Sequence, residues 1–278
     1  MNTILEPARI LLPGFGDAVS VDCEDAFFSA IHQSNGTTRM TSSGRLVDVD
    51  SAIADLLPGG NHLDVLDVGI SSGISTIEWL QSLEGNGRTC AMIAFDRVVF
   101  ARLYRFGPLQ VLAEEGGHVL LIHNGRRAIT RPAHRTGSWN NRVARTAFWL
   151  GDAGARLAKA IGAGDRVSLI SRRLQARSDV RVVEHDIFSP APDWNGRFDV
   201  VRVANLLNRS YFSEPQLRAG LRHVGGWVQP GGLLVVARSE ASGRNNATLF
   251  RREAAGLRVI HRLGSGSEVE ALVTPDAP

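Results

Sequence analysis

The residues most capable of chemistry lie together in the first third of the chain. A short apolar run leads into Asp67, which is followed by Gly69, Ser71 and Gly73 at alternate positions. Glycines allow the backbone to approach a ligand closely, and the first N–H groups of a following helix can bind it. Asp96 ends the next apolar run, where a carboxylate would accept hydrogen bonds from the two hydroxyls of a ribose. The order strand, turn, helix, strand and acid therefore predicts a nucleotide-cofactor site.

The glycine spacing distinguishes between two classes of cofactor. A dinucleotide-binding turn has the spacing G-x-G-x-x-G, and this chain has Ser71 and Ile74 where the second and third glycines would lie. The only lysine, Lys159, has Ala155 four residues before it, so the Tyr and Lys pair of short-chain dehydrogenases is absent. The turn therefore favours a cofactor that has no pyrophosphate.

Four motifs in the right order resemble those of the class I S-adenosylmethionine-dependent methyltransferases. The first is the glycine turn itself, whose residues Gly69, Ser71 and Gly73 would contact the cofactor. The other three are segments that resemble the third, fourth and fifth strands of that family, namely Val180–Phe188, Phe198–Leu207 and Trp227–Ser239. The resemblance covers most of the chain from residue 63 to residue 273, apart from a long insertion.

The resemblance implies roles for residues outside the glycine turn. Asp186 and Ile187, at the end of the third strand, lie where this family places an acid near the adenine amino group. Asn205 follows the fourth strand at its carboxyl end, where open α/β sheets bind their ligands. Asp67 either positions the glycine turn or binds the ammonium group of the cofactor. The implied cofactor is S-adenosylmethionine.

Some details are similar to the chemotaxis receptor glutamate methyltransferases within that class. Gly69–Gly73 is close to their Gly-Cys-Ser-Thr-Gly turn, and Ala204–Leu207 is similar to their fourth-strand segment. Asn35–Arg39 is similar to an N-terminal segment that touches the cofactor in that family, which implies that Thr37 and Arg39 reach the cofactor carboxylate. The paired phenylalanines of that segment and the acidic pair after the glycine turn are absent. The resemblance therefore extends to the fold and the cofactor, and not to a receptor substrate.

The composition is that of an ordinary globular protein. The chain has 278 residues, of which 44% are hydrophobic and 21% charged, enough for a sizeable core. No apolar run approaches the roughly 18–20 residues that cross a membrane. Cys23 and Cys90 are too few and too scattered for a disulfide framework or a metal cluster. We therefore expect no metal and a reduced, cytoplasmic setting.

The apolar patterns divide the chain into three parts. Residues 1–61 form an N-terminal extension with two helical patterns, which is expected to close over the cofactor. Residues 62–96 and 180–278 form the predicted methyltransferase domain. Residues 97–179 are too long for a simple crossover between two strands, which normally needs one helix. This insertion therefore predicts a separate cap over the active site.

The predicted fold is α/β: a Rossmann-like class I methyltransferase sheet with a C-terminal antiparallel hairpin, an N-terminal helical extension and an inserted α+β cap. The C-terminal hairpin is expected between residues 257–263 and 268–273. Within the insertion, residues 109–114 and 118–122 predict a second hairpin. Residues 139–161 have the spacing of an amphipathic helix, although two internal glycines interrupt it.

Positive charge is concentrated in the insertion. Between Arg97 and Arg177 there are fourteen arginines and one lysine against four acidic residues, a net charge of +11 in a chain whose total is +3. Three interpretations stay open: a pocket for an anionic small molecule or peptide carboxylate, a solvated or oligomer-forming face, and docking to nucleic acid or an anionic membrane.

The sequence therefore predicts a methyltransferase that acts on a small-molecule or peptide acceptor, with O-methylation of a carboxyl or hydroxyl favoured. The alternatives are a non-catalytic protein that binds S-adenosylmethionine or a partner, and an RNA methyltransferase. The segment after the fourth strand, Ala204–Leu207, lacks the Pro-Pro-aromatic motif of enzymes that methylate exocyclic amines. The sequence identifies no general base. Arg209 and Tyr211 are expected near the mouth of the pocket, whereas strand alternation should point His185 to the opposite face from Asp186.

Overall fold

The chain forms two compact units. The computed structural model describes a few N-terminal residues and most of the rest, namely Glu24, Phe27, Phe28, Ile31, Ser34 and residues 43–57, 59–123, 128–130 and 139–273. Residues 43–97 and 172–278 make one unit, called here the parallel unit. Residues 98–171, with the described residues before 43, make the other, called here the antiparallel unit.

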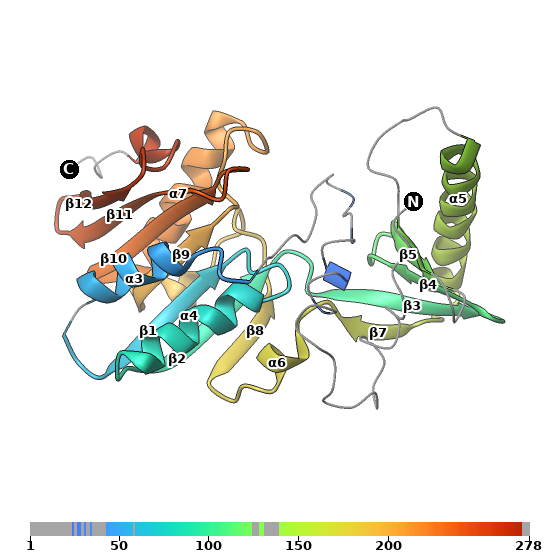
Figure 1. Cartoon of the computed structure of the whole chain (residues 1–278), viewed down its shortest axis with the longest axis horizontal. Helices are drawn as coiled ribbons and strands as arrows, with labels where there is room; N and C mark the ends of the chain where they lie inside the picture. Colours follow the sequence, from blue (N-terminus) through green and yellow to red (C-terminus); the bar gives the residue numbers. More distant parts are fainter. Residues whose placement is uncertain are drawn as a thin grey trace. The chain divides into compact units, whose positions relative to one another are not determined.

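The parallel unit is built on a seven-stranded sheet in the order β12-β11-β10-β9-β1-β2-β8 (Figure 1). The strands are β1 (His62–Val68), β2 (Thr89–Asp96), β8 (Val180–Glu184), β9 (Phe198–Ala204), β10 (Val228–Ser239), β11 (Asn245–Glu253) and β12 (Gly256–Leu263). The neighbouring strands β8, β2, β1, β9 and β10 pair in parallel. The pairs β10–β11 and β11–β12 are antiparallel. In the sheet, β2 lies on one side of β1, and β9, which comes later in the chain, lies on the other side of β1. This Rossmann-like order therefore has its switch point at the carboxyl ends of β1, β2 and β9, where such sheets bind ligands.

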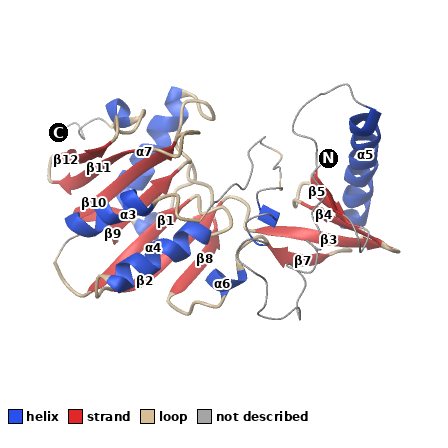
Figure 2. Cartoon of the chain, viewed as in Figure 1, coloured by secondary structure: helices blue, strands red, loops and turns tan. Residues whose placement is uncertain are grey.

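Helices cover both faces of the parallel sheet (Figure 2). They are α3 (Val47–Leu56), α4 (Ile74–Gly85), α6 (Arg172–Gln175) and α7 (Glu214–Trp227), with short 3-10 turns at Pro192–Trp194 and Glu270–Leu272. α7 begins at a capping box between Ser213 and Gln216 and buries an apolar stripe against the sheet. Because both faces are covered, the central strands β1 and β9 are almost entirely buried, and most of their residues are apolar.

The antiparallel unit is a five-stranded sheet in the order β6-β5-β4-β3-β7. Its strands are β3 (Phe100–Phe106), β4 (Leu109–Ala113), β5 (Val119–His123), β6 (Ala128–Thr130) and β7 (Asp165–Ser168), and every pairing is antiparallel. The predicted hairpin is confirmed as β4 and β5. α5 (Trp139–Ala160) is one unbroken helix despite its two glycines. The absent side chain at Gly151 lets the helix approach Val119, since a Cβ there would lie 3.3 Å from the Val119 Cγ2.

The predicted C-terminal hairpin is present, but its position was wrong. β12 agrees with the predicted strand at 257–263, yet it pairs with β11 rather than with residues 268–273, which contain a 3-10 turn. The turn between β11 and β12 is Ala254-Ala255, which carries no turn signal, and Gly256 takes the positive φ of 112°. The glycine and serine run after β12, expected to be the hairpin turn, instead places Ser267 N against the Thr248 Oγ1 at 2.8 Å.

The observed division of the chain differs in detail from the predicted one. Residues 43–61 were assigned to an extension, but they belong to the parallel unit, where α3 contacts α4 and β11. Residues 172–179 also belong to the parallel unit rather than to the insertion. The closure of the N-terminal segment over a cofactor and the capping role of the insertion stay predictions. No helix in the described part of the chain is long and apolar enough to cross a membrane.

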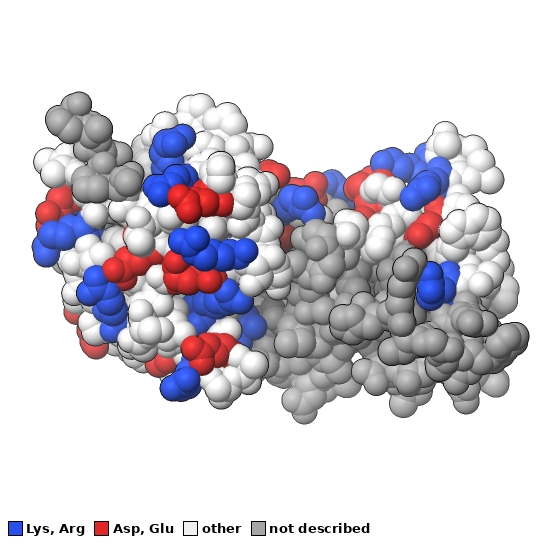
Figure 3. All heavy atoms as spheres, turned by 90° about the horizontal axis from the view of Figure 1, so that it is seen from above, with Lys and Arg blue, Asp and Glu red and all other residues white. Residues whose placement is uncertain are grey.

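Charges of both signs alternate on the surface of the parallel unit. Figure 3 shows basic and acidic side chains interspersed on one face of it. Several arginines of this unit form ion pairs with glutamates, as in Arg218–Glu214 at 2.9 Å and Arg262–Glu270 at 2.7 Å. These arginines are therefore held in local ion pairs.

Candidate functional site

The glycine turn connects β1 to α4 and is fixed by backbone hydrogen bonds. The N–H groups of Gly69 and Ile70 both donate to the Phe95 carbonyl, at 2.8 and 3.2 Å, and Gly73 N donates to the Ile70 carbonyl at 2.8 Å. Gly69 and Gly73 have φ values of 72° and 82°, in the left-handed region that favours glycine. A Cβ at Gly69 would lie 3.0 Å from the Leu206 Cδ2. The positive φ and the nearby Leu206 side chain therefore both favour glycine at position 69.

The acid at the end of β2 touches this turn. Ser71 N donates to the Asp96 Oδ2 at 2.8 Å, so the predicted ribose-binding carboxylate and the predicted cofactor turn are in direct contact. Asp96 is half-buried. The contact places a negative charge against the amide of the turn's central residue, where it can also accept hydrogen bonds from a ligand that lies on the turn.

Backbone strain is concentrated at the same edge of the sheet. Among the described non-glycine residues, only Ser71 and Asn205 have a positive φ, at 56° and 58°. Asn205 is held there by its N–H, which donates to the Ala237 carbonyl at 2.8 Å, and by its Oδ1, which accepts from Ser239 N at 2.7 Å. Residues in this region are uncommon and cluster at functional sites. Both strained residues were predicted from the sequence to bind the cofactor.

The third strand brings Asp186 to the same edge. His185 N donates to the Asp96 carbonyl at 3.1 Å, which keeps the segment after β8 beside the end of β2. The Asp186 Oδ1 accepts from Phe188 N at 2.9 Å in a tight turn. Ile187 is buried in the core, with 5% of the residue exposed. The adenine-binding role of Asp186 and Ile187 stays a prediction.

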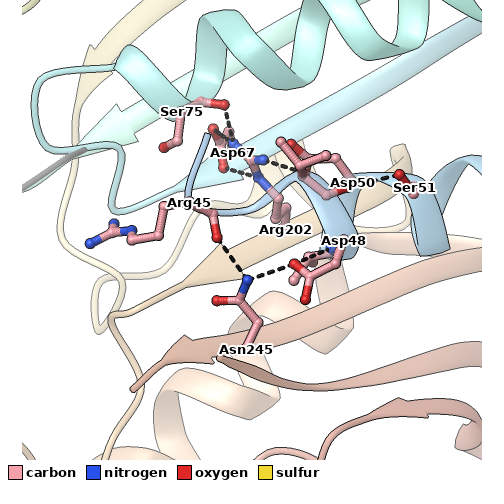
Figure 4. Close-up of polar contacts among 10 residues, drawn as sticks. Arg45, Asp48, Asp50, Ser51, Asp67, Ser75, Arg202 and Asn245 are labelled. Carbon is pink, nitrogen blue, oxygen red and sulfur yellow. Dashed lines mark hydrogen bonds and ion pairs between the residues drawn. The ribbon is translucent and has the colours of Figure 1, made fainter. Parts of the chain in front are cut away.

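Asp67 has a different environment from the other predicted residues (Figure 4). Both of its carboxylate oxygens accept hydrogen bonds from Arg202: Nε to Oδ1 at 3.0 Å and Nη2 to Oδ2 at 2.7 Å. Arg202 Nη1 donates to the Asp50 Oδ1 at 2.7 Å, and the three side chains are only 1–5% exposed. Of the two roles predicted for Asp67, this favours positioning the turn over binding the ammonium group.

This buried triad carries two carboxylates and one guanidinium. Burial raises the pKa of Asp50 to about 6, against the opposing effect of Arg202. Burial lowers the pKa of Arg202, but Asp67 and Asp50 outweigh it and the net shift is upward. Asp67 receives two hydrogen bonds from Arg202 and Asp50 receives one. Asp50 is therefore a carboxylate that takes up a proton in the folded protein at a higher pH than an exposed aspartate does.

A second polar chain links the site to α3. The Ser239 Oγ donates to the Asn245 Oδ1 at 2.7 Å, and Ser239 N is the donor to Asn205 described above. The Asn245 Nδ2 donates to the Arg45 carbonyl at 2.7 Å and to the Asp48 Oδ1 at 2.6 Å, at the start of α3 (Figure 4). α3 is thus fixed twice to elements that carry the site.

The sequence argument missed Arg202, Asp50, Ser239 and Asn245. A signal for Arg202 was available, because it is a charged residue inside the apolar run of a central strand, where a charge must be paired. Nothing comparable marked Asp50, which resembles an ordinary acid in the first turn of a helix. The predicted Thr37 and Arg39 lie outside the described residues.

The candidate bases have separate surroundings. The His185 ring packs edge-on against Phe95 and Trp194, with ring centroids 5.3 and 4.8 Å apart, inside an aromatic cluster. Tyr211 is 55% exposed and follows a turn made by Asn208, whose Oδ1 accepts from Tyr211 N at 3.1 Å. Tyr211 is therefore more accessible to an acceptor than His185.

The residues at the edge of the sheet fit S-adenosylmethionine better than a phosphate. Residues 69–73 carry no basic side chain, and two carboxylates, Asp96 and Asp186, end the neighbouring strand segments. Carboxylates repel phosphates but accept hydrogen bonds from ribose hydroxyls and from an adenine amino group. The Ser72 hydroxyl, fully buried in the turn, has no hydrogen-bond partner among the described residues. The polar groups at this edge of the sheet therefore match a nucleoside cofactor without phosphates.

No protein-family model matches the chain, and no curated protein matches its sequence. The chain is similar to several solved structures of methyltransferases. An O-methyltransferase family protein from Burkholderia thailandensis is 18% identical, with 70% of this chain and 37% of that chain covered and a TM-score of 0.32. The 1,6-didemethyltoxoflavin N1-methyltransferase of the same organism, solved with S-adenosylhomocysteine, is 15% identical, with 83% and 66% covered and a TM-score of 0.38.

A third similar structure is the N-methyltransferase NodS from Bradyrhizobium japonicum, also solved with S-adenosylhomocysteine. It is 12% identical, with 79% of this chain and 76% of that chain covered and a TM-score of 0.37. These proteins are of the class that the sequence motifs resemble, although this chain spans only about a third of the first of the three. Because the TM-scores are below 0.5, the functional argument rests on the geometry of the site.

Proposed function

We propose that the parallel unit binds S-adenosylmethionine and that the protein is a methyltransferase. The observation that carries this proposal is the contact between the Ser71 amide and the Asp96 carboxylate at 2.8 Å. It joins the glycine turn after β1 to the acid after β2, which is the pairing that a ribose-containing cofactor needs. The strained conformations of Ser71 and Asn205 at the same edge support it.

The bound cofactor would supply a methyl group carried on a sulfonium sulfur. An acceptor atom would attack the methyl carbon, and the sulfur would leave as part of S-adenosylhomocysteine. The residues of this chain then have to bind, orient and exclude water. We infer that Asp96 accepts hydrogen bonds from the ribose hydroxyls and that Asp186 accepts one from the adenine amino group. Asn205 fixes the end of β9 beside the turn, through its two hydrogen bonds to β10.

We further propose that the acceptor is a small molecule or a peptide group and that the methylated atom is an oxygen of a carboxyl or hydroxyl. The net charge of +11 between Arg97 and Arg177 would attract an anionic acceptor. A carboxylate is already ionised at neutral pH and needs no general base. This agrees with a site for which no base has been identified.

Calorimetric titration with S-adenosylmethionine and S-adenosylhomocysteine tests the cofactor, with NAD as the control ligand. We expect both compounds to bind and NAD not to bind. Asp96→Asn keeps an oxygen that accepts from Ser71 N but loses the charge, so we expect weaker binding with an unchanged fold. Asp64→Asn, in β1 at the opposite end of the same sheet, is the matched control and should bind as the wild type does. Binding of NAD alone, or of no ligand, would exclude the proposal.

Turnover separates the enzyme from a non-catalytic binding protein. The wild type is incubated with labelled S-adenosylmethionine and with small-molecule, peptide and RNA fractions of a cell extract. Label in the small-molecule or peptide fraction supports the proposed acceptor. Label in RNA, with binding that weakens steeply as salt increases, would establish the nucleic-acid alternative. Tight cofactor binding without transfer to any fraction would favour the non-catalytic alternative.

A further inference from the structure

One guanidinium group contacts three of the elements near the glycine turn. Arg202, on β9, donates to Asp67 on β1 through Nε and Nη2 and to Asp50 on α3 through Nη1. Its Nη2 also donates to the Ser75 carbonyl on α4 at 3.1 Å, and its Cζ lies 4.3 Å from the centre of the Trp79 ring. Figure 4 shows the contacts of Arg202 with Asp67, Asp50 and Ser75.

The contacts of Arg202 lie on both sides of the turn. Asp67 is two residues before Gly69, and Ser75 is two residues after Gly73. The planar guanidinium donates in fixed directions, so a single side chain sets the separation of the strand end from the helix start. Between these two points the chain holds Ser71 at a φ of 56°, a conformation that persists only when its surroundings fix it.

We propose that Arg202 is a positioning residue for the cofactor: it holds the two ends of the glycine turn at the separation that binding requires, and through Asp50 it makes that separation depend on the docking of α3. The inference rests on the proposed function for its ligand. Arg202 touches neither the turn residues 69–73 nor Asp96 in any described contact, so it acts through Asp67 and Ser75.

Stability alone does not account for an arginine at this position. Apolar residues of similar volume can replace a whole buried ion triad without loss of stability, and the strand on either side of Arg202 is apolar. Three apolar side chains in place of Arg202, Asp67 and Asp50 would fill the space but would leave the separation between the end of β1 and the first turn of α4 unset. Buried polar networks whose hydrogen bonds are satisfied can fix a single arrangement of the elements that they connect.

The experiment compares Arg202→Lys with Arg177→Lys. Lysine keeps the charge but loses the fork that contacts several partners at once. Arg177 is a matched control in the same unit, because it also bridges two carboxylates, Glu84 at the far end of α4 and Asp179, whose Oδ2 lies 2.6 Å from its Nη2. Amide hydrogen exchange of residues 69–76 is measured without ligand, and the Kd for S-adenosylhomocysteine is measured by calorimetry.

We expect Arg202→Lys to increase exchange across residues 69–76 and to raise the Kd by on the order of tenfold or more, since small displacements in a binding site have large effects. Arg177→Lys should leave both quantities close to those of the wild type. Equal changes in the two variants would overturn the proposal, because a general loss of stability would then explain them.

A second variant keeps the test decisive if Arg202→Lys does not fold. Asp50→Asn leaves the Arg202–Asp67 pair in place and can still accept a hydrogen bond from Nη1. We expect faster exchange in α3 together with a higher Kd, and faster exchange in α3 with an unchanged Kd would overturn the link to α3. Should the wild type bind neither S-adenosylmethionine nor S-adenosylhomocysteine, the proposed function fails, whereas the exchange comparison still decides whether Arg202 holds the turn.

Discussion

The two units of this protein differ in where their most connected described ion pairs lie. In the parallel unit, Arg202 and its two carboxylates have side chains that are 1–5% exposed. In the antiparallel unit, the ion pairs among described residues lie at the surface: Arg102–Glu115 has side chains 32% and 41% exposed, and Lys159–Glu115 has 51% and 41%. Burial removes the screening by water, so the same chemical pair has very different consequences in the two units. Among the ion pairs of the described residues, the fully buried network belongs to the parallel unit.

Removing the buried guanidinium should have the largest effect. Arg202→Met leaves Asp67 and Asp50 buried without a partner, and we expect a loss of about 3–5 kcal/mol in the free energy of unfolding of the parallel unit. Arg102→Met, in the antiparallel unit, should change that unit's stability by at most about 1 kcal/mol. Urea unfolding followed by hydrogen exchange reports on each unit separately. A small effect of Arg202→Met would contradict the contrast between the units.

The buried triad should also make the parallel unit sensitive to pH. Burial raises the pKa of Asp50 from 3.8 to about 6; Arg202 opposes this increase, and Asp67 and Glu78 add to it. The folded protein therefore keeps a proton that the unfolded chain releases. Asp50 stabilises the fold fully below pH 3.8, and this contribution is lost as the pH rises through about 6. The full difference is about 3 kcal/mol.

Asp50→Asn tests this dependence, because asparagine does not titrate. The free energy of unfolding is measured by urea at intervals from pH 4 to pH 7.5. We expect the wild type to lose stability relative to the variant as the pH rises, mainly between pH 4 and pH 6. A constant difference between the two proteins over this range would show that Asp50 does not take up a proton in the folded state.

Much of the parallel unit was predictable because its signals are local. β1, β2 and β9 are apolar runs, and α7 begins at Ser213 with a capping residue three positions later. The pairing of β11 with β12 was not, because the turn at Ala254-Ala255 lacks the residues that mark a hairpin. The edge residues of the site were predictable for the same local reason, since each follows the end of an apolar run.

The triad shows what sequence reasoning cannot reach. Arg202 is 135 residues from Asp67 and 152 residues from Asp50, so no local pattern connects them. A charge inside a buried strand predicts that a partner exists, but the chain contains 28 acidic residues, and only the fold selects two of them. The positive φ of Ser71 is similar, because a serine does not predict it, and the Asp96 carboxylate that accepts from its amide lies 25 residues away in the sequence.

A pair of glycines with similar backbone conformations gives a smaller contrast. Gly69 in the parallel unit has a φ of 72° and little space, since a Cβ would lie 3.0 Å from Leu206. Gly107 in the antiparallel unit has a φ of 59° and no atom within 4 Å of a Cβ. Alanine should lower stability by about 1 kcal/mol at Gly107 and by about 2 kcal/mol at Gly69, where steric overlap adds to conformational strain. Thermal unfolding of the two variants measures the difference, and equal losses would mean that Leu206 moves away without penalty.

The smallest effect should come from the most connected surface acid of the antiparallel unit. Glu115 pairs with both Arg102 and Lys159, as Arg202 pairs with both Asp67 and Asp50, so the two residues match in the number of ionic partners. They differ in burial, and water screens the pairs of Glu115. Glu115→Gln should therefore change the free energy of unfolding of its unit by about 0.5 kcal/mol or less, and by less still at high salt. Urea unfolding at low and high salt measures this change. A loss as large as that expected for Arg202→Met would mean that the number of ionic partners, rather than their burial, decides what an ion pair contributes in this protein.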